Sequence, residues 1–115
     1  MQQLDTKEQF IWLKDFYAPL LTARQQEILN LYLDGDYTLS EIAESCGSTR
    51  QAIYDMVRRT EKLLTGYEEK LGLWQRFRTA RRKAEQAEAL VERLNCDEKA
   101  KQEICQALDE MLAVL

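Results

Sequence analysis

Forty-six consecutive residues of this chain, 49–94, contain no proline and carry an apolar side chain at almost every third or fourth position. Such spacing is typical of a helix that buries one face. A single helix of this length would measure about 69 Å at roughly 1.5 Å per residue, which exceeds the diameter of a small domain. The stretch must therefore break, protrude from the domain, or pair with another chain.

Two apolar seams follow one another along this stretch. Both advance by alternating steps of four and three residues, but the second is offset by one residue, or about 100° around the helix. We expect the first seam to face the core of a helical domain and the second to lie on an arm, with a bend at Gly66 or Gly72. The first seam consists of Ile53, Val57, Thr60, Leu64, Tyr67, Leu71 and Trp74. The second consists of Leu73, Phe77, Ala80, Ala84, Ala87, Val91 and Leu94.

Two helices are predicted before this stretch. The first begins after residues 5–6 and ends at Tyr17, because Pro19 disfavours a helical conformation in the residue before it. The second covers 23–34 and ends at Gly35, which is expected in the left-handed position that follows many helices. Their predicted buried faces consist of Phe10, Leu13, Phe16, Tyr17 and Leu20 in the first helix and of Ile28, Leu29 and Tyr32 in the second.

The segment 39–58 has the layout of a helix-turn-helix motif. Thr38 and Glu41 have the spacing of a capping box at the start of its first helix. Gly47 permits the left-handed turn that ends this helix, and Ala43 is small where the second helix must cross. The wedge between the two helices is expected to hold Ile42, Cys46, Ile53 and Met56.

The second helix of the motif carries polar side chains that suit nucleic acid. Arg50 and Gln51 can form paired hydrogen bonds with guanine and adenine edges, and the neighbouring tyrosine and arginines can hold phosphates. However, Asp55 lies among them, and residues 38–62 hold four basic and four acidic groups, so the motif lacks the positive field of most DNA readers. A scaffold that binds protein or RNA is the alternative. The candidate nucleic-acid-binding residues are Thr49, Arg50, Gln51, Tyr54, Arg58 and Arg59.

Positive charge is concentrated just after the motif. The chain carries a net charge of −4, but residues 1–69 contribute −5, residues 70–83 contribute +6 and residues 84–115 contribute −5. A short basic stretch interleaved with aromatic residues is typical of a helix that binds phosphate or a partner, although a solvated face paired with acidic neighbours has the same composition. This basic patch consists of Lys70, Arg76, Arg78, Arg81, Arg82 and Lys83.

The chain is therefore expected to be all-α, with a helix-turn-helix domain in residues 1–69 and a basic helix, helical arm and C-terminal helix in residues 70–115. The last helix should follow a short connection at 95–97 and cover 98–114. It can fold back on the arm or meet the arm of a second subunit. A homodimer is the favoured arrangement, because one short helix covers little of an alanine-rich seam. The apolar face of this last helix consists of Ile104, Cys105, Leu108, Met111 and Leu112.

Composition argues against several functional classes. The chain has no histidine and no glycine-rich phosphate loop, so neither an enzyme nor a bound metal or cofactor is expected. No apolar run approaches the roughly 18 residues of a membrane-spanning helix, so membrane insertion is not expected. Three cysteines are an odd number, which favours the cytoplasm over an oxidising compartment. Cys46 is expected in the core, and Cys96 and Cys105 as exposed thiols.

Three stretches carry a resemblance to a known family: DFYAPLLTARQQEILNLYLDGDYTLSEIAE, STRQAIYDMVRRTEKLL and YEEKLGLWQRF. They resemble the YlxM family, small helix-turn-helix proteins of Gram-positive bacteria whose genes lie beside those for signal recognition particle components. Residues 21–64 are also similar to region four of bacterial sigma factors, the module that reads promoter elements. The resemblance covers most of the chain, but the sequence departs from the family pattern after about Arg82.

The resemblance implies an all-helical, dimerising protein with a regulatory or accessory role in the signal recognition particle pathway. Two functions remain open at this point. The first is a regulator that binds duplex DNA through the helix-turn-helix motif. The second is an accessory protein that binds the GTPase or the RNA of the particle through residues 70–83.

Overall fold

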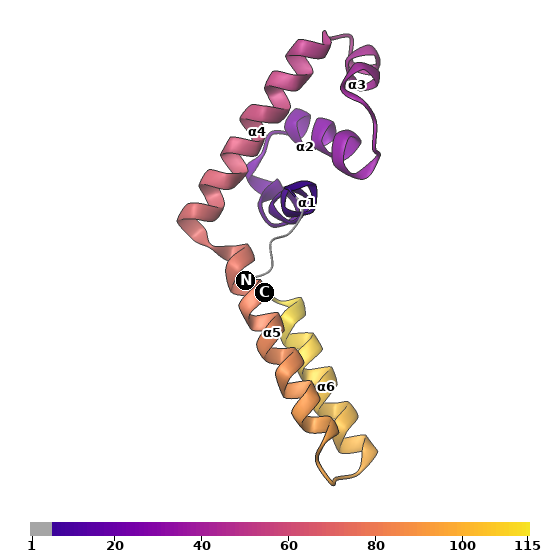
Figure 1. Ribbon diagram of the computed structural model, residues 1–115, viewed down its shortest axis with the longest axis vertical. Helices are drawn as coiled ribbons and strands as arrows, with labels where there is room; N and C mark the ends of the chain where they lie inside the picture. The colour runs from indigo at the N-terminus through magenta and orange to yellow at the C-terminus, as the bar shows by residue number, and fades with distance from the viewer. Residues whose placement is uncertain (1–5) are drawn as a thin grey trace. The chain divides into compact units, whose positions relative to one another are not determined.

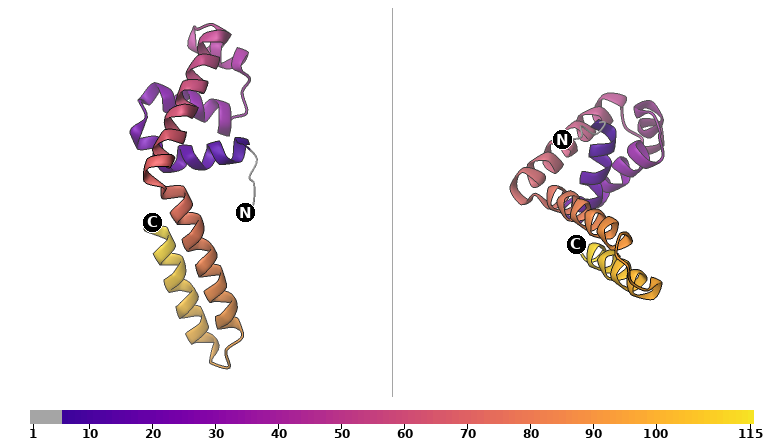
Figure 2. Two further views of the ribbon diagram at one scale, coloured as in Figure 1. Left: turned by 60° about the vertical axis from the view of Figure 1, so that its left-hand side comes forward. Right: turned by 60° about the horizontal axis from the view of Figure 1, so that its bottom comes forward.

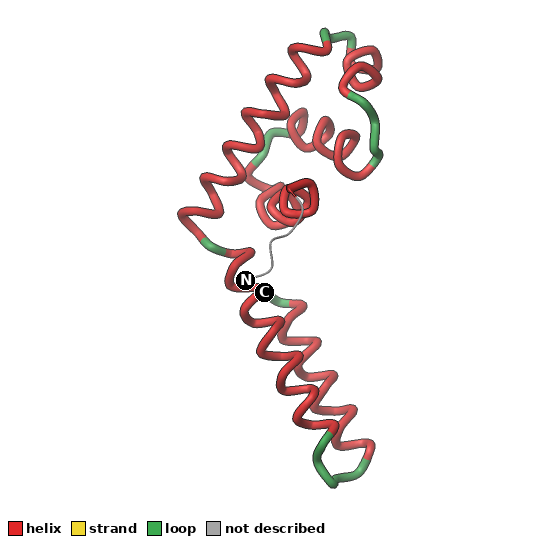
Figure 3. The backbone as a smooth tube through the Cα atoms, in the orientation of Figure 1, coloured by secondary structure: helices red, strands yellow, loops and turns green. Residues whose placement is uncertain are grey.

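A computed structural model describes residues 6–115 of the chain. These residues form helices joined by short loops, and no strand occurs among them, which confirms the predicted all-α class (Figures 1 and 3). In chain order the elements are α1 (Thr6–Tyr17), η1 (Ala18–Leu20), α2 (Ala23–Leu29), η2 (Asn30–Asp34), α3 (Leu39–Cys46), α4 (Arg50–Leu71), α5 (Leu73–Glu92) and α6 (Glu98–Ala113). Among the described residues, no helix combines the length and the apolar character that crossing a bilayer requires.

The long proline-free stretch breaks at Gly72. This residue has a φ of +61°, in the left-handed region, and its amide donates a hydrogen bond to the Glu68 carbonyl (2.8 Å), which ends α4. Gly66, the other predicted bend, lies within α4. The chain divides into two compact units between Gly72 and Leu73, whereas the division expected from charge was at 69/70. We call them the helix-turn-helix unit (6–72) and the hairpin unit (73–115) and describe each by itself.

The core of the helix-turn-helix unit forms where α1, α2 and α3 pack against α4 (Figures 1 and 2). The first seam supplies the α4 side of this core, since Ile53, Val57, Thr60 and Leu64 are all buried. The Thr60 hydroxyl is satisfied by donating to the Met56 carbonyl (2.8 Å). The seam ends earlier than predicted: Leu71 is 47% exposed, and Trp74 belongs to α5.

Tyr17 joins the end of α1 to the last turns of α4. Its ring is buried, 5.9 Å from the Tyr67 ring between centroids, and its hydroxyl donates a hydrogen bond to Glu68 Oε1 (2.6 Å). The α-helix stops at Tyr17 as predicted, and the chain continues through the 3₁₀ turn η1, which contains Pro19. Because this turn directs Leu20 outward, that side chain is 54% exposed rather than buried as predicted.

The second predicted helix is not one α-helix. Its first part, α2, changes after Leu29 into the wider turn η2, and Gly35 has a φ of −87° instead of the left-handed value predicted. The left-handed residue is Asp36, with a φ of 55°. Glycine is needed at 35 for space, because a Cβ atom there would lie 2.8 Å from the Tyr37 ring.

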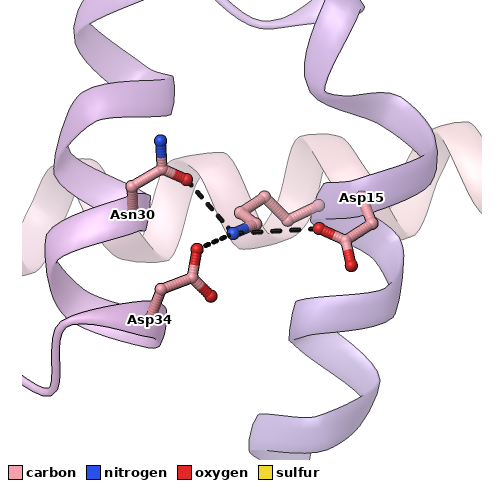
Figure 4. A network of polar contacts seen from close by, with 4 residues as sticks. Asp15, Asn30 and Asp34 are labelled. Carbon is pink, nitrogen blue, oxygen red and sulfur yellow. Dashed lines mark hydrogen bonds and ion pairs between the residues drawn. The ribbon is translucent and has the colours of Figure 1, made fainter.

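Lys14 connects α1 with η2. Although its side chain is almost wholly buried, its ammonium group donates to Asn30 Oδ1 (3.1 Å) and Asp34 Oδ2 (2.5 Å) and lies 3.8 Å from Asp15 Oδ1 (Figure 4). A buried charge requires such partners, since an unpaired one costs several kcal/mol. The network therefore holds η2 against α1.

The hairpin unit consists of α5 and α6, which lie side by side and antiparallel (Figure 2). Asp97 caps α6 by accepting a hydrogen bond from the Ala100 amide (2.6 Å). Within this unit α6 packs along the second seam, where Ala84 and Val91 are buried. The second seam was predicted to face another subunit, but in the structure α6 of the same chain covers it. This arrangement corresponds to the predicted alternative in which the last helix folds back on the arm.

Some hairpin residues differ from expectation. Leu73 and Leu94, at the two ends of the second seam, are 40% and 53% exposed. Ile104 and Met111 are also exposed, because α6 meets α5 along a narrow strip that includes the half-buried Cys105. The helices are also slightly shorter than predicted, with α5 ending at Glu92 and α6 at Ala113, and the connection between them is correspondingly longer.

Acidic groups gather around the contact between α5 and α6. Partial burial raises the pKa of the Glu88 carboxyl group, and the negative charges of the neighbouring Asp109 and Glu85 raise it further. Burial also raises the pKa of the Cys105 thiol, and Glu88, Glu92 and Asp109 add to this shift. Cys105 is thus not the freely exposed thiol predicted, whereas Cys96 is exposed.

Replacing the two predicted bend glycines should have opposite effects on stability. No atom lies within 4 Å of a Cβ placed on Gly66 or Gly72, so only backbone conformation distinguishes them. Gly72→Ala should lower the free energy of unfolding by about 1 kcal/mol, because alanine is strained at positive φ. Gly66→Ala should raise it by about 0.5–1 kcal/mol, because alanine favours a helix interior. Urea unfolding followed by circular dichroism measures both, and a stabilising Gly72→Ala would contradict the assigned break.

Glu88→Gln should stabilise the hairpin unit at neutral pH. A carboxyl group whose pKa is raised in the folded state destabilises that state when ionised, and this cost disappears as pH falls through the raised pKa. The gain in melting temperature should therefore shrink between pH 7 and mildly acidic pH. Glu98→Gln, which removes a carboxylate from the first turn of α6, serves as a control and should give no gain. An equal gain at both pH values would refute the assignment to Glu88.

Candidate nucleic-acid interface

The turn between α3 and α4 fixes the direction of α4. At the start of α3, Thr38 and Glu41 form the predicted capping box, with hydrogen bonds of 3.1 and 3.2 Å. At its end, Gly47 is left-handed (φ +68°) and the Ser48 amide donates to the Ala43 carbonyl (2.9 Å). This pair of features is the Schellman motif, which satisfies carbonyls at the end of a helix.

Packing behind the turn holds the two helices together. Ile42 and Ile53 are no more than 1% exposed, and Ala43 is 5% exposed, so a small side chain occupies the crossing as predicted. Thr49 then caps α4, since its hydroxyl accepts a hydrogen bond from the Ala52 amide (3.1 Å). The first turns of α4 are therefore held on one side by apolar packing and at the end by a cap.

The opposite side of α4 is exposed. All six candidate nucleic-acid-binding residues are exposed, and they belong to one end of α4 and its cap. Arg50, Tyr54 and Arg58 follow one another at intervals of four residues, which places them along one stripe of the helix. The structure thus brings these residues together on a surface that a ligand can approach.

Asp55 organises part of this surface. Its carboxylate accepts a hydrogen bond from the Gln51 amide group (3.0 Å), and its carbonyl accepts one from Arg59 Nε (3.4 Å). The Arg58 guanidinium lies 6.0 Å from the centroid of the Tyr54 ring. The Arg50 side chain forms no hydrogen bond or ion pair with another described residue, so its guanidinium group is available to a ligand.

Arg24 is a member of this surface that sequence analysis missed. It lies in the first turn of α2, where its guanidinium group donates to the Ser48 hydroxyl (3.4 Å), beside the turn of the motif. Nothing in the spacing of residues 39–58 could indicate a contribution from α2. Its only signal in the sequence is a basic residue directly after the predicted helix start at 23.

A hollow of about 460 Å³ adjoins the same end of α4. Tyr54 and Arg58 belong to both the hollow and the candidate surface. An ion pair between Lys7 and Asp36 lies at its margin. The remaining lining residues are mostly apolar or aromatic: Phe10, Tyr32, Leu33, Tyr37, Leu39, Val57 and Glu61.

The basic patch does not form a single stripe. Lys70 lies on α4, and the other five residues lie on α5, beyond the break. At about 100° per residue, Arg76 and Lys83 fall on one side of α5, whereas Arg78, Arg81 and Arg82 fall on the other. Some of this charge has partners: the Arg78 guanidinium lies 4.7 Å from the Trp74 ring centroid, and Arg81 Nε lies 3.4 Å from Glu85 Oε1.

Comparison with known proteins agrees with this architecture. A family profile described as "Putative helix-turn-helix protein, YlxM / p13 like" matches residues 4–111. A UPF0122 protein of Limosilactobacillus fermentum is 46% identical over 72% of this chain and 74% of its own length. One of Latilactobacillus sakei is 54% identical over 55% and 56%, and one of Desulforamulus reducens is 46% identical over 72% and 66%. The extent of the profile match, across both units, shows that the chain belongs to the YlxM/p13-like helix-turn-helix family.

Proposed function

We propose that the protein is a regulatory helix-turn-helix protein that binds duplex DNA with the first turns of α4 in the major groove. The observation that supports this most is the exposed set on α4, which is held from behind by Ile42, Ala43 and Ile53. A rigid helix end carrying side chains that match base edges is how such motifs read DNA. The resemblance of residues 21–64 to a promoter-reading module of sigma factors supports the same function.

Each side chain has a distinct role in this proposal. Arg50 forms paired hydrogen bonds with a guanine edge. Gln51 contacts adenine, for which it must first leave the Asp55 carboxylate. Thr49, at the N-terminus of α4, and Tyr54 contact the backbone or a base edge. Phosphates are held by Arg58, Arg59 and Arg24.

Binding should be weak and moderately salt-dependent. Asp55 repels phosphate from the middle of the surface, and Lys7 and Lys14 are paired with carboxylates of their own unit. Three phosphate contacts give an observed association constant that falls with salt with a log-log slope of about −3. Much of the affinity must then come from groove contacts.

The protein targeting pathway is the context that we propose for this activity. Its support is the resemblance to YlxM proteins, whose genes lie beside those for signal recognition particle components. In that pathway the protein either controls gene expression or contacts the particle directly. The two alternatives use different surfaces of this chain.

A second candidate function is that of an accessory protein which binds the RNA or the GTPase of the particle. The observation that favours it is the basic patch, because residues 70–83 contain six basic side chains and no acidic one. Arg78, Arg81 and Arg82 share one side of α5, so one phosphate-bearing partner can contact all three.

Arg50→Ala should weaken duplex binding about 5- to 150-fold, which corresponds to the roughly 1–3 kcal/mol of one paired base contact. The probe is a fluorescent pool of random 30-base-pair duplexes, followed by gel retardation and anisotropy at 50 mM salt. Arg82→Ala is the matched control, because it also removes one arginine but lies outside the proposed surface. The proposal fails if the wild-type protein retards no duplex, or if both variants lose affinity equally.

For the second candidate, Arg81→Glu combined with Arg82→Glu should abolish binding to transcribed signal recognition particle RNA or to the purified GTPase. Arg50→Ala should leave that binding unchanged. The same anisotropy measurement applies to the labelled RNA, and co-sedimentation applies to the GTPase. Undiminished binding by the double variant would remove the basic patch from this function.

A further inference from the structure

The hollow beside α4 has the size of a small-molecule site. Its volume of about 460 Å³ falls near the lower end of the roughly 300–1,000 Å³ that such sites occupy. Its floor is apolar and consists of the buried side chains of Phe10, Leu33 and Val57. These residues come from α1, η2 and α4, so the hollow is built by the packing of three separate elements of one unit.

Aromatic rings surround this floor. Tyr32 belongs to η2, Tyr37 to the loop before α3 and Tyr54 to α4, and all three line the hollow. Tyr37 and Tyr54 are 47% and 41% exposed, so a ligand can still cover part of each residue. Flat aromatic molecules pack well against such rings, in offset or edge-to-face arrangements. The lining therefore favours an aromatic ligand.

The backbone next to Tyr37 has an unusual conformation. Gly35 leaves space for the Tyr37 ring, and Asp36 has a φ of 55° although it is not glycine. The Asp36 carboxylate pairs with Lys7 of α1, and the Tyr37 amide donates a hydrogen bond to the Leu31 carbonyl (3.1 Å). Residues held in such conformations cluster at ligand-binding sites. The loop thus holds Tyr37 at the wall of the hollow before any ligand binds.

Two charged side chains of the lining form no ion pair with another described residue. They are Arg58 and Glu61, which lie one turn apart on α4. Lys7 and Asp36, by contrast, neutralise each other. The α4 wall therefore presents one positive and one negative group, whose Cβ atoms are about 5–6 Å apart at this spacing.

We propose that this hollow binds a free aromatic amino acid. The ring of the ligand lies on the apolar floor beside Tyr32 and Tyr37, its α-carboxylate pairs with Arg58, and its α-ammonium group pairs with Glu61. One carbon atom joins the two charged groups of the ligand, so residues one helical turn apart can contact both. A nucleotide fits less well, because the two basic groups of the lining are balanced by two acidic ones.

The ligand uses side chains that the proposed function assigns to DNA. Tyr54 and Arg58 line the hollow and also belong to the candidate surface. Arg58 cannot hold a phosphate while its guanidinium group pairs with the amino acid. Occupation of the hollow therefore lowers the affinity for duplex DNA, and the duplex lowers the affinity for the ligand by the same factor. This regulation rests on the proposed function, whereas ligand binding itself does not.

Isothermal titration calorimetry of the full chain with phenylalanine, tyrosine and tryptophan tests the site. At least one of them should bind with a dissociation constant below about 1 mM, as expected for a ligand of this size. Leucine should bind about 5-fold more weakly, because it lacks the ring. Absence of binding by all three aromatic amino acids, or tighter binding of adenosine monophosphate, would overturn the proposal.

Analogues of the bound amino acid test the two charge contacts without altering the protein. The amine that lacks the carboxylate and the acid that lacks the ammonium group should each bind about 10-fold more weakly, since each loses one charge-assisted contact. Binding of either analogue as tightly as the amino acid would refute the recognition of both charges.

Glu61→Gln tests the location of the site. This substitution should weaken binding of the amino acid about 10-fold, because the ammonium group loses its ionic partner. Glu44→Gln is the matched control, since it removes the same charge from an exposed position of α3 that does not line the hollow. Circular dichroism checks that both variants stay folded, and the analogues decide the matter if Glu61→Gln does not. Equal affinities of the two variants would contradict the assignment.

Anisotropy of the duplex probe with saturating amino acid tests the regulation. The duplex affinity of the wild-type protein should fall at least about 5-fold. In Glu61→Gln, the same ligand concentration should change the duplex affinity less. An unchanged wild-type affinity at saturation would refute the coupling of the two sites. If the protein binds no duplex, the proposed function fails, and calorimetry still decides whether the hollow binds the amino acid.

Discussion

The left-handed turn at Gly47, together with the packing behind it, is the constraint on which the proposed site depends. Gly47 reverses the chain between α3 and α4, and the small Ala43 lets the two helices cross closely. A side chain at 47 would meet no neighbouring atom, so conformation, and not space, demands glycine there. Because Ile53 is buried at this crossing, the residues on the other side of α4 must face outward.

Local signals were sufficient to predict most of the elements. The cap at Thr38 and the turn at Gly47 involve neighbours only a few residues apart, and both are found in the structure. Apolar periodicity correctly placed the buried residues of α4 as far as Leu64. Such features could be read from one sequence because their energies arise within one or two helical turns.

Features that depend on distant contacts were not predictable. Gly66 and Gly72 look alike in sequence, and only the folded chain shows which of them is left-handed. The role of Gly35 depends on the position of the Tyr37 ring, and that of Arg24 on the approach of α2 to the turn. Periodicity also cannot tell whether the second seam meets the same chain or another, because both arrangements bury the same residues.

In this protein, the position and the ion-pair partners of the charged residues matter for nucleic-acid binding as well as their number. The net charge of −4 argues against nucleic acid, yet several acidic groups of the helix-turn-helix unit are engaged with Lys7 and Lys14. Arg50 and Arg58 lie at an exposed helix end. Asp55 lies between them in the sequence, and its carboxylate accepts a hydrogen bond from Gln51. The net charge therefore says less about nucleic-acid binding than the arrangement of the arginines on α4.

Nuclear magnetic resonance of the ¹⁵N-labelled full chain tests the central claim most directly, because it locates a ligand by residue. Addition of the duplex pool at low salt should shift the amide signals of residues 48–59 and Arg24 most strongly. The signals of residues 76–83 should remain unchanged. Shifts confined to residues 76–83, with residues 48–59 unaffected, would contradict the assignment of α4 as the helix that reads DNA.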